Sequence, residues 1–537
     1  MTYDVLFLNA KIVDGAGTPW YRGDVAVKDG KIAEIGALAG ARAKEVADVA
    51  GRVLCPGFID VHTHSDFVIF RDPVMREKLA QGVTTQLLGQ CGESAAPVKD
   101  KYLDLLITYM GFVMAGADVK WTWHSFDEWL CEVEKLKLAG NVAPCVGHGT
   151  IRVAVMGFED RPADAKELAE MKDLLREAMD AGCYGMSSGL IYPPGVFTPA
   201  LEIQELASVL SETGGIYFSH MRNESGGLLQ SVEEILELGR RAKIPVQISH
   251  HKALGRDNWG MVTKSLKMVD EARAEGVDVT IDQYPYRRCS TSVRACLPPW
   301  VQEGGVPSIC KRLEDPEIRA KVTKEIEESL DMSKPCSWES MMRHAGGPAG
   351  GLVIYCPATP QWEGRNLREI ADAMGKTPIE AAYDIIMANN GNDLACYDTI
   401  DEADLKTVLA HPATMIGSDS IPATPGGKAH PRSYGTNPRI LGKYVREEKT
   451  LSLETAVYKM TGLPSSRLGL QHKGLVREGM DADLVVFDPA TVRDRGTYDN
   501  PSLPPLGIDS VYVAGQKVID MGEYTGATPG KVLRRNR

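Results

Sequence analysis

The chain has 537 residues, a length that exceeds one small core but that an α/β barrel can reach as a single unit. Its hydrophobic content of 43% and charged content of 25% are ordinary for a globular protein. The net charge of −12 argues against nucleic acid and anionic membranes as partners, but a local cationic pocket can still bind a small anionic substrate.

The cysteines and the first residues bear on the cellular compartment. Eleven cysteines are scattered along the chain without a C-x-x-C motif, which indicates free thiols in a reducing compartment. The first residues lack the pattern of a secretory signal, and no apolar stretch is long enough to cross a membrane. We therefore expect a cytoplasmic protein without a membrane partner. Its oligomeric state stays open, with a homo-oligomer as one option.

Short strands separated by turns dominate both ends of the chain. They fall at residues 4–8, 11–15, 24–32, 483–488 and 510–518. Asp29-Gly30 lies between two alternating runs and predicts a hairpin turn. We expect a small β-sandwich domain built from both termini, residues 1–54 plus 475–537. Separate β-extensions at each end are the alternative.

The middle of the chain alternates strands and helices. Eight strands are predicted, at residues 53–61, 83–89, 142–147, 184–188, 216–219, 246–249, 278–282 and 414–417. Amphipathic helices with apolar residues at i, i+3 and i+4 are predicted at 165–181, 201–213, 229–243 and 261–275. This order predicts an α/β fold, a (β/α)8 TIM-like barrel over residues 55–474. A doubly wound open sheet is the competing topology.

The connection between the last two predicted strands is unusually long. Its irregular part, residues 287–351, is rich in proline and glycine pairs and contains a charged helical stretch at 315–330. We interpret it as an insertion over the barrel mouth; a plain surface embellishment is the alternative.

Side chains that can bind metal close several predicted strands. His62 and His64 follow the first strand, and residues i and i+2 of a strand point the same way. Other strand ends carry Cys91, His220, His250 and Asp419. Each of these residues also has a structural alternative. Cys91 would be an inert buried thiol, His220 and His250 would be core histidines, and Asp419 would be a helix N-cap. Because a barrel brings all strand ends to one face, their coincidence predicts a metal site.

The type of ligand suggests which metal and which chemistry. Imidazole and thiolate suit Zn²⁺, whereas magnesium prefers oxygen ligands. Zinc lowers the pKa of bound water, and Asp419 is the residue expected to take the proton from that water and pass it to the leaving group.

Several segments resemble the motifs of one enzyme family. Gly57–Asp66 looks like the opening motif of the amidohydrolase superfamily, and residues 479–487 resemble its return to a β-domain. Further segments narrow the resemblance to the N-acyl-D-amino-acid deacylases, or D-aminoacylases; they are residues 82–85, 90–92, 147–150, 188–195, 250–252, 417–419 and 430–435. The resemblance runs from Tyr3 to Gly522, and only the joint set of motifs is specific.

The resemblance implies a metal-dependent hydrolase that cleaves the amide bond of N-acyl-D-amino acids to a carboxylate and a free D-amino acid. It implies a tight zinc site at Cys91, His220 and His250, and a second, weaker metal at His62 and His64. Asp419 would be the general acid/base. Strand four, residues 183–189, lacks the lysine or glutamate with which many relatives bridge two metals.

The same comparison suggests how the substrate is held. Lys252, Arg432 and Tyr192 match positions that in the family bind the α-carboxylate of the acyl amino acid, and Tyr284 adds a hydroxyl. Arginine pairs with a carboxylate through two hydrogen bonds and lysine supplies a point charge. The alternative is that both cations pair with acidic neighbours for structural reasons.

Some residues depart from the family pattern. Gln90 stands where asparagine is frequent, Glu93 where an apolar residue is frequent, and Ser420 where glycine is frequent. These departures leave the identity of the substrate undecided. His148 is expected to be a structural hydrogen-bonding residue, and His251 to point away from His250.

Two other functions compete with the main interpretation. One is a cyclic amidase resembling hydantoinases or dihydroorotases, against which the missing strand-four lysine counts. The other is a non-catalytic metal-binding scaffold on the same fold, against which the intact Cys91, His220, His250 and Asp419 count.

Overall fold

The computed structural model describes residues 2–114, 116–334, 336–423 and 427–535. Both ends of the chain join one nine-stranded sheet, in the order β21-β20-β19-β18-β5-β1-β2-β3, with β4 paired to β1. Its strands are β1 (Thr2–Ile12), β2 (Tyr21–Lys28), β3 (Lys31–Gly36), β4 (Arg42–Asp48), β5 (Val53–Pro56), β18 (Leu484–Phe487), β19 (Ile508–Val513), β20 (Gln516–Asp520) and β21 (Glu523–Tyr524).

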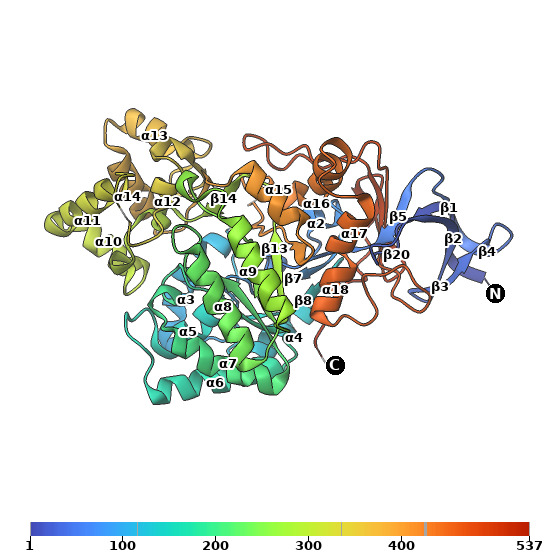
Figure 1. Cartoon of the computed structure of the whole chain (residues 1–537), viewed down its shortest axis with the longest axis horizontal. Helices are drawn as coiled ribbons and strands as arrows, with labels where there is room; N and C mark the ends of the chain where they lie inside the picture. Colours follow the sequence, from blue (N-terminus) through green and yellow to red (C-terminus); the bar gives the residue numbers. More distant parts are fainter. Residues whose placement is uncertain (1, 115, 335, 424–426, 536–537) are drawn as a thin grey trace.

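The two ends meet where β5 pairs antiparallel with β18. Every residue of these two strands is buried, so each strand lacks the polar face that a solvent-exposed strand would show. The predicted hairpin turn is present between β2 and β3, because Asp29 and Gly30 both have positive φ, as a type I′ turn requires. In Figure 1 the amino-terminal strands lie at one end of the molecule, beside the red carboxy-terminal segment.

Parallel strands form the middle of the molecule in two sheets, β6-β7-β8 and β17-β13-β12-β11-β10-β9. Their bounds are β6 (Phe58–Asp60), β7 (Val83–Leu87), β8 (Asn141–Ala143), β9 (Val146–Gly147), β10 (Gly185–Gly189), β11 (Ile216–His220), β12 (Val246–Ile248), β13 (Val279–Gln283) and β17 (Thr414–Ile416). Backbone contacts also link the two sheets: Thr63, after β6, pairs in parallel with Ser420, after β17, and Cys145 donates to the carbonyl of Leu88.

Two of the predicted strands are each divided in the structure. The run 53–61 breaks at Gly57, because β5 joins the nine-stranded sheet while β6 pairs with β7. A side chain at Gly57 would collide with Thr84. The run 142–147 breaks at Pro144, which has no N–H to donate to a ladder. The other six predictions match single strands within about two residues, the usual uncertainty of element ends.

Helices follow most of the parallel strands. The four predicted amphipathic helices correspond to α6 (Ala165–Asp180), α7 (Ala200–Thr213), α8 (Leu228–Ala242) and α9 (Val262–Ala274). In α6, Asp164 and Glu167 form a capping box, and Met171, Leu175, Ala178 and Met179 make the buried face. The remaining helices of this part are α1 (Val68–Arg71), α2 (Arg76–Leu79), α3 (Leu103–Met114), α4 (Phe126–Glu134), α5 (His148–Met156), α15 (Glu402–Ala410), α16 (Arg432–Arg439), α17 (Leu453–Met460) and α18 (Gly462–Leu468).

The long connection between β13 and β17 has more regular structure than its sequence suggests. A three-stranded antiparallel sheet, β14-β16-β15, lies at its centre. The strands and α-helices of the connection are β14 (Arg288–Thr291), α10 (Val306–Glu314), α11 (Pro316–Ser329), α12 (Met341–His344), β15 (Gly351–Tyr355), α13 (Leu367–Met374), α14 (Pro378–Ala388) and β16 (Leu394–Asp398). The charged stretch 315–330 is α11. The sheet reaches well beyond residue 351, because β14 pairs with β16 about a hundred residues later in the chain, a register that local sequence does not reveal. Helices α10, α11, α13 and α14 form the lobe opposite the amino-terminal strands in Figure 1.

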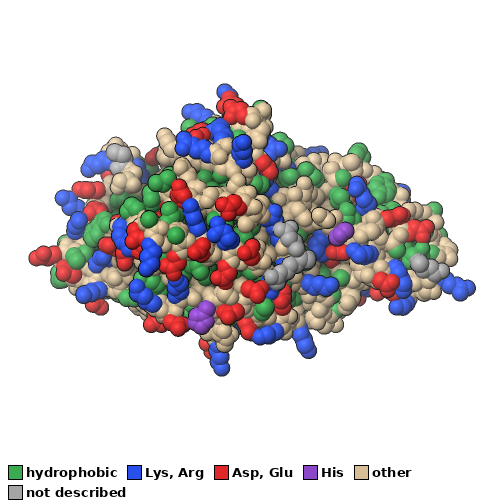
Figure 2. Space-filling view, turned by 90° about the horizontal axis from the view of Figure 1, so that it is seen from below, with side chains coloured by type: hydrophobic (Ala, Val, Ile, Leu, Met, Phe, Trp, Pro, Cys, Tyr) green, Lys and Arg blue, Asp and Glu red, His purple; other side chains and the backbone are tan. Residues whose placement is uncertain are grey.

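Surface and cysteine chemistry agree with an ordinary globular chain. On the face shown in Figure 2, basic and acidic side chains are interspersed. Each of the eleven cysteines has a free thiol. Within the described residues, none of the helices combines the length and the apolar character that crossing a membrane requires.

Candidate metal centre

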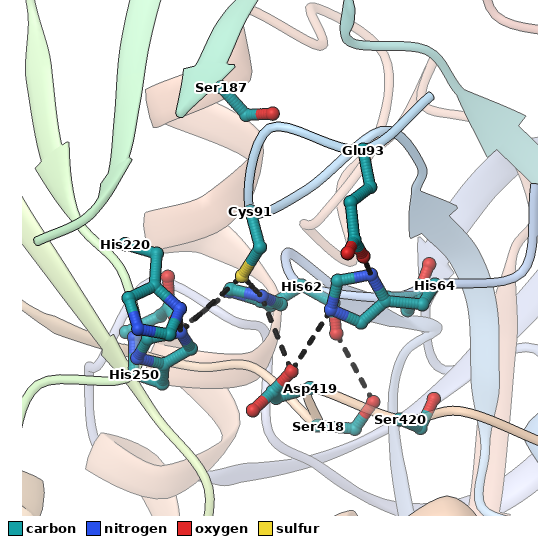
Figure 3. Close-up of polar contacts among 12 residues, drawn as sticks. His62, His64, Cys91, Glu93, Ser187, His220, His250, Ser418, Asp419 and Ser420 are labelled. Carbon is teal, nitrogen blue, oxygen red and sulfur yellow. Dashed lines mark hydrogen bonds and ion pairs between the residues drawn. The ribbon is translucent and has the colours of Figure 1, made fainter. Parts of the chain in front are cut away.

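The six predicted metal-site residues converge at the carboxyl ends of the parallel strands. His62 and His64 follow β6, Cys91 follows β7, His220 ends β11, and the others follow β12 and β17. All six, His62, His64, Cys91, His220, His250 and Asp419, are buried, and Figure 3 shows their side chains pointing toward one another.

Three of these residues have an uncommon backbone conformation. The φ angles of Cys91, His250 and Asp419 are 53°, 35° and 49°. Positive φ is unfavourable for residues other than glycine, and such strain tends to gather at functional sites.

The donor atoms fall into two groups that share Cys91. One group contains Cys91, His220 and His250, the other contains His62, His64, Cys91 and Asp419, and within each group the atoms lie within 4.8 Å of one another. Cys91 Sγ is 3.4 Å from His250 Nε2 and 3.3 Å from His62 Nε2. His250 Nε2 is 2.9 Å from His220 Nδ1.

These donors fit a zinc ion. Tetrahedral zinc bonds of ~2.0–2.3 Å place neighbouring nitrogen and sulfur ligands roughly 3.3–3.8 Å apart, which matches the distances of 3.3 and 3.4 Å from Cys91 Sγ to His62 and His250. Burial by itself would raise the pKa of the Cys91 thiol, but the charges of His62 and His250 outweigh that effect and hold its pKa well below the usual range. The thiolate that results is the form of cysteine that binds metal.

A carboxylate lies close to each of the four histidines of the cluster, an arrangement that the sequence did not predict. His62 Nδ1 is 3.2 Å from Asp282 Oδ1, and His64 Nδ1 is 3.3 Å from Glu93 Oε2. Glu224 lies 3.1 Å from His250 Nδ1 and 3.6 Å from His220 Nε2. Asp282 lies at the end of β13, so the search for side chains at strand ends that selected the metal ligands could also have found it. Glu224 lies in the loop after β11, where no local sequence pattern distinguishes it.

Asp419 lies between the histidines and a cation. Its Oδ1 is 3.1 Å from His64 Nε2, and its Oδ2 is 2.8 Å from Arg432 Nη1. Burial favours the neutral acid, yet Arg432, followed by His62, holds the pKa of Asp419 well below its usual range. Asp419 is therefore an ionised carboxylate at neutral pH.

A second buried cation secures the loop that carries Asp419. Lys78 Nζ, on α2, donates to Asp60 Oδ2 at 2.7 Å and to Ser418 Oγ at 2.9 Å, and it also contacts Ser420 Oγ. Asp60 in turn accepts the backbone N–H of Ser418 at 2.8 Å. Local sequence gives no sign of these roles of Lys78 and Asp60, because their contacts with Ser418 join residues more than 300 positions apart.

The residues predicted to clamp the substrate lie close to the cluster, with both cations already paired. Lys252 Nζ is 2.7 Å from Glu224 Oε2 and 2.8 Å from His250 Nδ1. The guanidinium of Arg432 pairs with Asp419 and lies 4.7 Å above the ring of Tyr284. Tyr192 packs edge-on against His220, and the Tyr284 hydroxyl has no hydrogen-bond partner within the described residues. The alternative considered from the sequence, that Lys252 and Arg432 pair with acidic neighbours, is therefore found at both cations.

Two adjoining cavities open over the cluster. The inner one is lined by donors of both groups together with Lys252, Tyr192 and Tyr284. The outer one has a volume of about 420 Å³ and shares Glu93, Phe112, Tyr192 and Thr291 with the inner one. Part of its wall comes from the connection between β13 and β17, including Arg294 and Trp338.

Two further histidines lie outside the cluster. His148 Nε2 is 2.9 Å from Glu202 Oε1, and His251 Nε2 is 2.8 Å from Ser265 Oγ. His148 thus makes the structural hydrogen bond expected of it, and His251 turns away from His250.

Parallel strands whose carboxyl ends hold a buried histidine, cysteine and aspartate cluster define a class, the metal-dependent α/β hydrolases. A family model described as "Amidohydrolase family" matches residues 45–519. The chain belongs to the amidohydrolase family.

Characterised relatives cover nearly the whole chain. It is 36% identical to a D-aminoacylase of Alcaligenes xylosoxydans xylosoxydans, over 99% of this chain and 98% of that protein. An N-acyl-D-aspartate deacylase of the same organism is also 36% identical, over 99% and 95%. The crystal structure of N-acyl-D-glutamate deacylase from Bordetella bronchiseptica, complexed with zinc and a phosphonate inhibitor, superposes with a TM-score of 0.83 at 33% identity, covering 99% of this chain and all of that one.

Proposed function

We propose that this protein is a zinc-dependent hydrolase that cleaves the amide bond of N-acyl-D-amino acids, releasing a carboxylate and a free D-amino acid. The observation that carries the proposal is the position of Cys91, whose sulfur belongs to both donor groups beside an ionised Asp419. The relatives named above act on this class of substrate. A cyclic amidase has less support, because β10 offers no lysine to bridge two metals.

The scaffold is a (β/α)8 barrel over residues 55–474, with an insertion that begins at about 287 and, because β14 pairs with β16, continues beyond 351. Residues 1–54 plus 475–537 form a separate small β-domain. The barrel interpretation is supported by the parallel pairing of successive strands and by the contact between Thr63 and Ser420 at the outer ends of the two sheets.

Cys91, His220 and His250 hold one zinc ion tightly, and His62 and His64 hold a second, weaker metal. The donor set supports zinc because it is rich in imidazole and thiolate. When bound, zinc supplies Lewis acidity that polarises the amide carbonyl and makes water a nucleophile near neutral pH.

Asp419 moves the proton. Oδ2 pairs with Arg432, whereas Oδ1 faces the proposed metal ligands His62 and His64, so Oδ1 is the oxygen that accepts a proton from the attacking water and delivers it to the leaving nitrogen. The loop tied by Lys78 holds this carboxylate at its place, and burial keeps bulk water from competing for the proton.

The α-carboxylate of the substrate binds at the cationic side of the inner cavity, with Arg432, Lys252, Tyr192 and Tyr284 as the clamp. Arg432 Nε and Nη2 and the Tyr284 hydroxyl are buried donors without a partner in the described residues, so they can bind an anion. Both cations are paired with a carboxylate, but Lys252 Nζ also contacts His250, whereas Arg432 keeps two donors without a partner in the described residues. Arg432 is therefore the stronger partner for the substrate.

The test is a substrate panel on the purified, zinc-loaded protein. N-acetyl-D-amino acids, their L-enantiomers and cyclic ureides are compared by release of free amine or ring opening. We expect hydrolysis of the D-substrates alone. Turnover of the cyclic ureides only would establish the cyclic amidase instead, and no turnover of any substrate would favour a scaffold.

Cys91→Ala tests the metal centre in the same assay. We expect this variant to lose bound zinc together with activity, because both donor groups lose their common atom. Full zinc content by elemental analysis would contradict the assignment of Cys91 as a ligand.

A further inference from the structure

We infer that Glu93 is a positioning residue for the second metal ion: its carboxylate holds His64 in the orientation that strengthens binding at the His62 and His64 side of the cluster. The inference rests on the metal centre proposed above and concerns a residue that the chemistry of that centre does not itself require. Figure 3 shows Glu93 beside His64, on the side away from Asp419.

Glu93 and His64 lie at ion-pair distance, although His64 Nδ1 makes no hydrogen bond within the described residues. Glu93 Oε2 lies 3.3 Å from His64 Nδ1, and both side chains are buried. His64 Nε2 faces Asp419 Oδ1 at 3.1 Å. The two ring nitrogens thus face different carboxylates, and Asp419 cannot take over the contact at Nδ1 when Glu93 is removed.

The backbone of Glu93 is itself fixed. Its N–H donates to the carbonyl of Gln90 at 2.9 Å, which closes a tight turn over Cys91. The turn packs against Gly147, where a side-chain Cβ would lie only 2.6 Å from Glu93 N. The carboxylate is therefore presented to His64 from a rigid support.

A carboxylate behind a metal-binding imidazole has a known physical effect. It accepts the proton of one ring nitrogen, which leaves the lone pair of the other nitrogen free for the metal, and it makes that nitrogen a better donor. Glu224 stands in this relation to His250 through a hydrogen bond, and Asp282 lies at ion-pair distance from His62 Nδ1. Glu93 lies at a similar distance from His64 Nδ1, which makes no hydrogen bond within the described residues.

Glu93 has a second oxygen with a different environment. Oε1 has no hydrogen-bond partner within the described residues, and Glu93 lines both cavities. If Glu93 served only to select substrates, it would act through Oε1, and replacing Glu93 would leave metal binding unchanged. Metal affinity measured without substrate therefore separates the two roles.

The experiment measures zinc binding to metal-free protein by calorimetric titration, with elemental analysis after equilibrium dialysis. The wild type is expected to bind two equivalents. Glu93→Leu should keep the first and bind the second about 10–100-fold more weakly, the usual loss when such a supporting group is removed. Glu93→Gln should fall between them, because its amide oxygen can still accept from Nδ1–H.

Glu234→Gln is the matched control. Glu234 lines the same outer cavity and pairs with Arg222 at 2.9 Å, away from the cluster. It should bind both equivalents as the wild type does. A loss equal to that of Glu93→Leu would mean that cavity charge, not the contact with His64, sets the affinity, which overturns the inference.

The remaining outcomes are also decisive. Wild-type affinity for both equivalents in Glu93→Leu, or a wild type that binds one equivalent only, overturns the inference and leaves the hydrolase proposal intact. A wild type that binds no zinc overturns the proposed function itself. If Glu93→Leu does not fold, Glu93→Gln carries the test: weaker binding of the second equivalent alone supports the inference, and unchanged binding overturns it.

Discussion

At the scale of single residues, the site depends on buried charges that neutralise one another at short range. Asp419 and Arg432 form one such pair, and Glu224 and Lys252 another. A buried ion pair is strongly destabilised when one partner is removed, since the other charge is left uncompensated. Substitutions here must therefore be judged on turnover and on stability together.

Asp419→Asn keeps the size and polarity of the side chain but cannot accept a proton. We expect the variant to fold and to keep zinc at Cys91, His220 and His250, while kcat falls about 100-fold or more. Steady-state kinetics with an N-acetyl-D-amino acid, alongside zinc analysis, measures both. Turnover like that of the wild type would contradict the role of Asp419 as proton carrier.

Arg432→Met removes a cation that contacts Asp419 and is proposed to bind the substrate. We expect kcat to fall with every substrate, because the position and ionisation of Asp419 depend on this contact. For acyl amino acids, kcat/KM should fall by roughly a further 10–100-fold, which corresponds to losing a charge-assisted hydrogen bond of about 1.5–3 kcal/mol.

The control for Arg432→Met is a substrate in which a neutral amide replaces the carboxylate. This substrate never forms the charge-assisted bond, so it should show only the loss in kcat. Equal losses on both substrates would mean that Arg432 acts through Asp419 alone.

At the scale of elements, the loop after β17 depends on a helix far away in sequence. Lys78 on α2 bonds to Asp60 at the end of β6 and to Ser418 in this loop. One buried side chain thus connects a helix, the end of a strand and the loop that carries Asp419. The left-handed backbone of Asp419 persists because these contacts hold the residues on either side of it.

Lys78→Met should destabilise the protein by about 3–5 kcal/mol, because Asp60 would remain as a buried charge without its cation. Ser420→Ala removes one contact of the same lysine and leaves the ion pair, so its loss should be near 1 kcal/mol, as for an ordinary hydrogen bond. Denaturant unfolding of both variants measures the difference. Equal losses would show that the Lys78–Asp60 pair adds nothing beyond a single hydrogen bond.

At the scale of the whole molecule, segments from the two ends of the chain pair with each other and with the parallel strands. β5 pairs with β18, and residues 530–535 lie beside β8 and the segment before β10. Four backbone hydrogen bonds fix this tail: Gly530 to Leu138, Val142 to Lys531, Leu533 to Val142 and Arg535 to Gly182. The tail therefore holds β8 and the segment before β10 in place.

Deleting the chain from Thr528 onward should lower the stability of the strand ends remote from the metal site. Four lost backbone bonds correspond to about 2–6 kcal/mol in total. We expect a lower thermal unfolding midpoint with zinc binding retained below it. Arg534→Ala, which removes the ion pairs with Glu134, at 2.7 Å, and with Asp127 but keeps the backbone bonds, should lower the midpoint less. An unchanged midpoint after deletion would contradict a structural role for the tail.

The sequence by itself determined the order of the parallel strands, four of the helices between them and the residues that close the strands. Hydrophobic periodicity is a local property, so β7, β11 and α6 to α9 could be predicted within a few residues. The rule that parallel strands end on one face then selected the residues that the structure brings together in the cluster.

Only the tertiary structure decided which side chains support that cluster and which cations are already paired. Glu93 behind His64, Glu224 beside Lys252, and Lys78 between Asp60 and Ser418 depend on contacts across long stretches of chain. The register of β14 on β16 has the same origin. Local propensity carries no information about such distances, because burial and charge pairing are settled only when distant elements pack against one another.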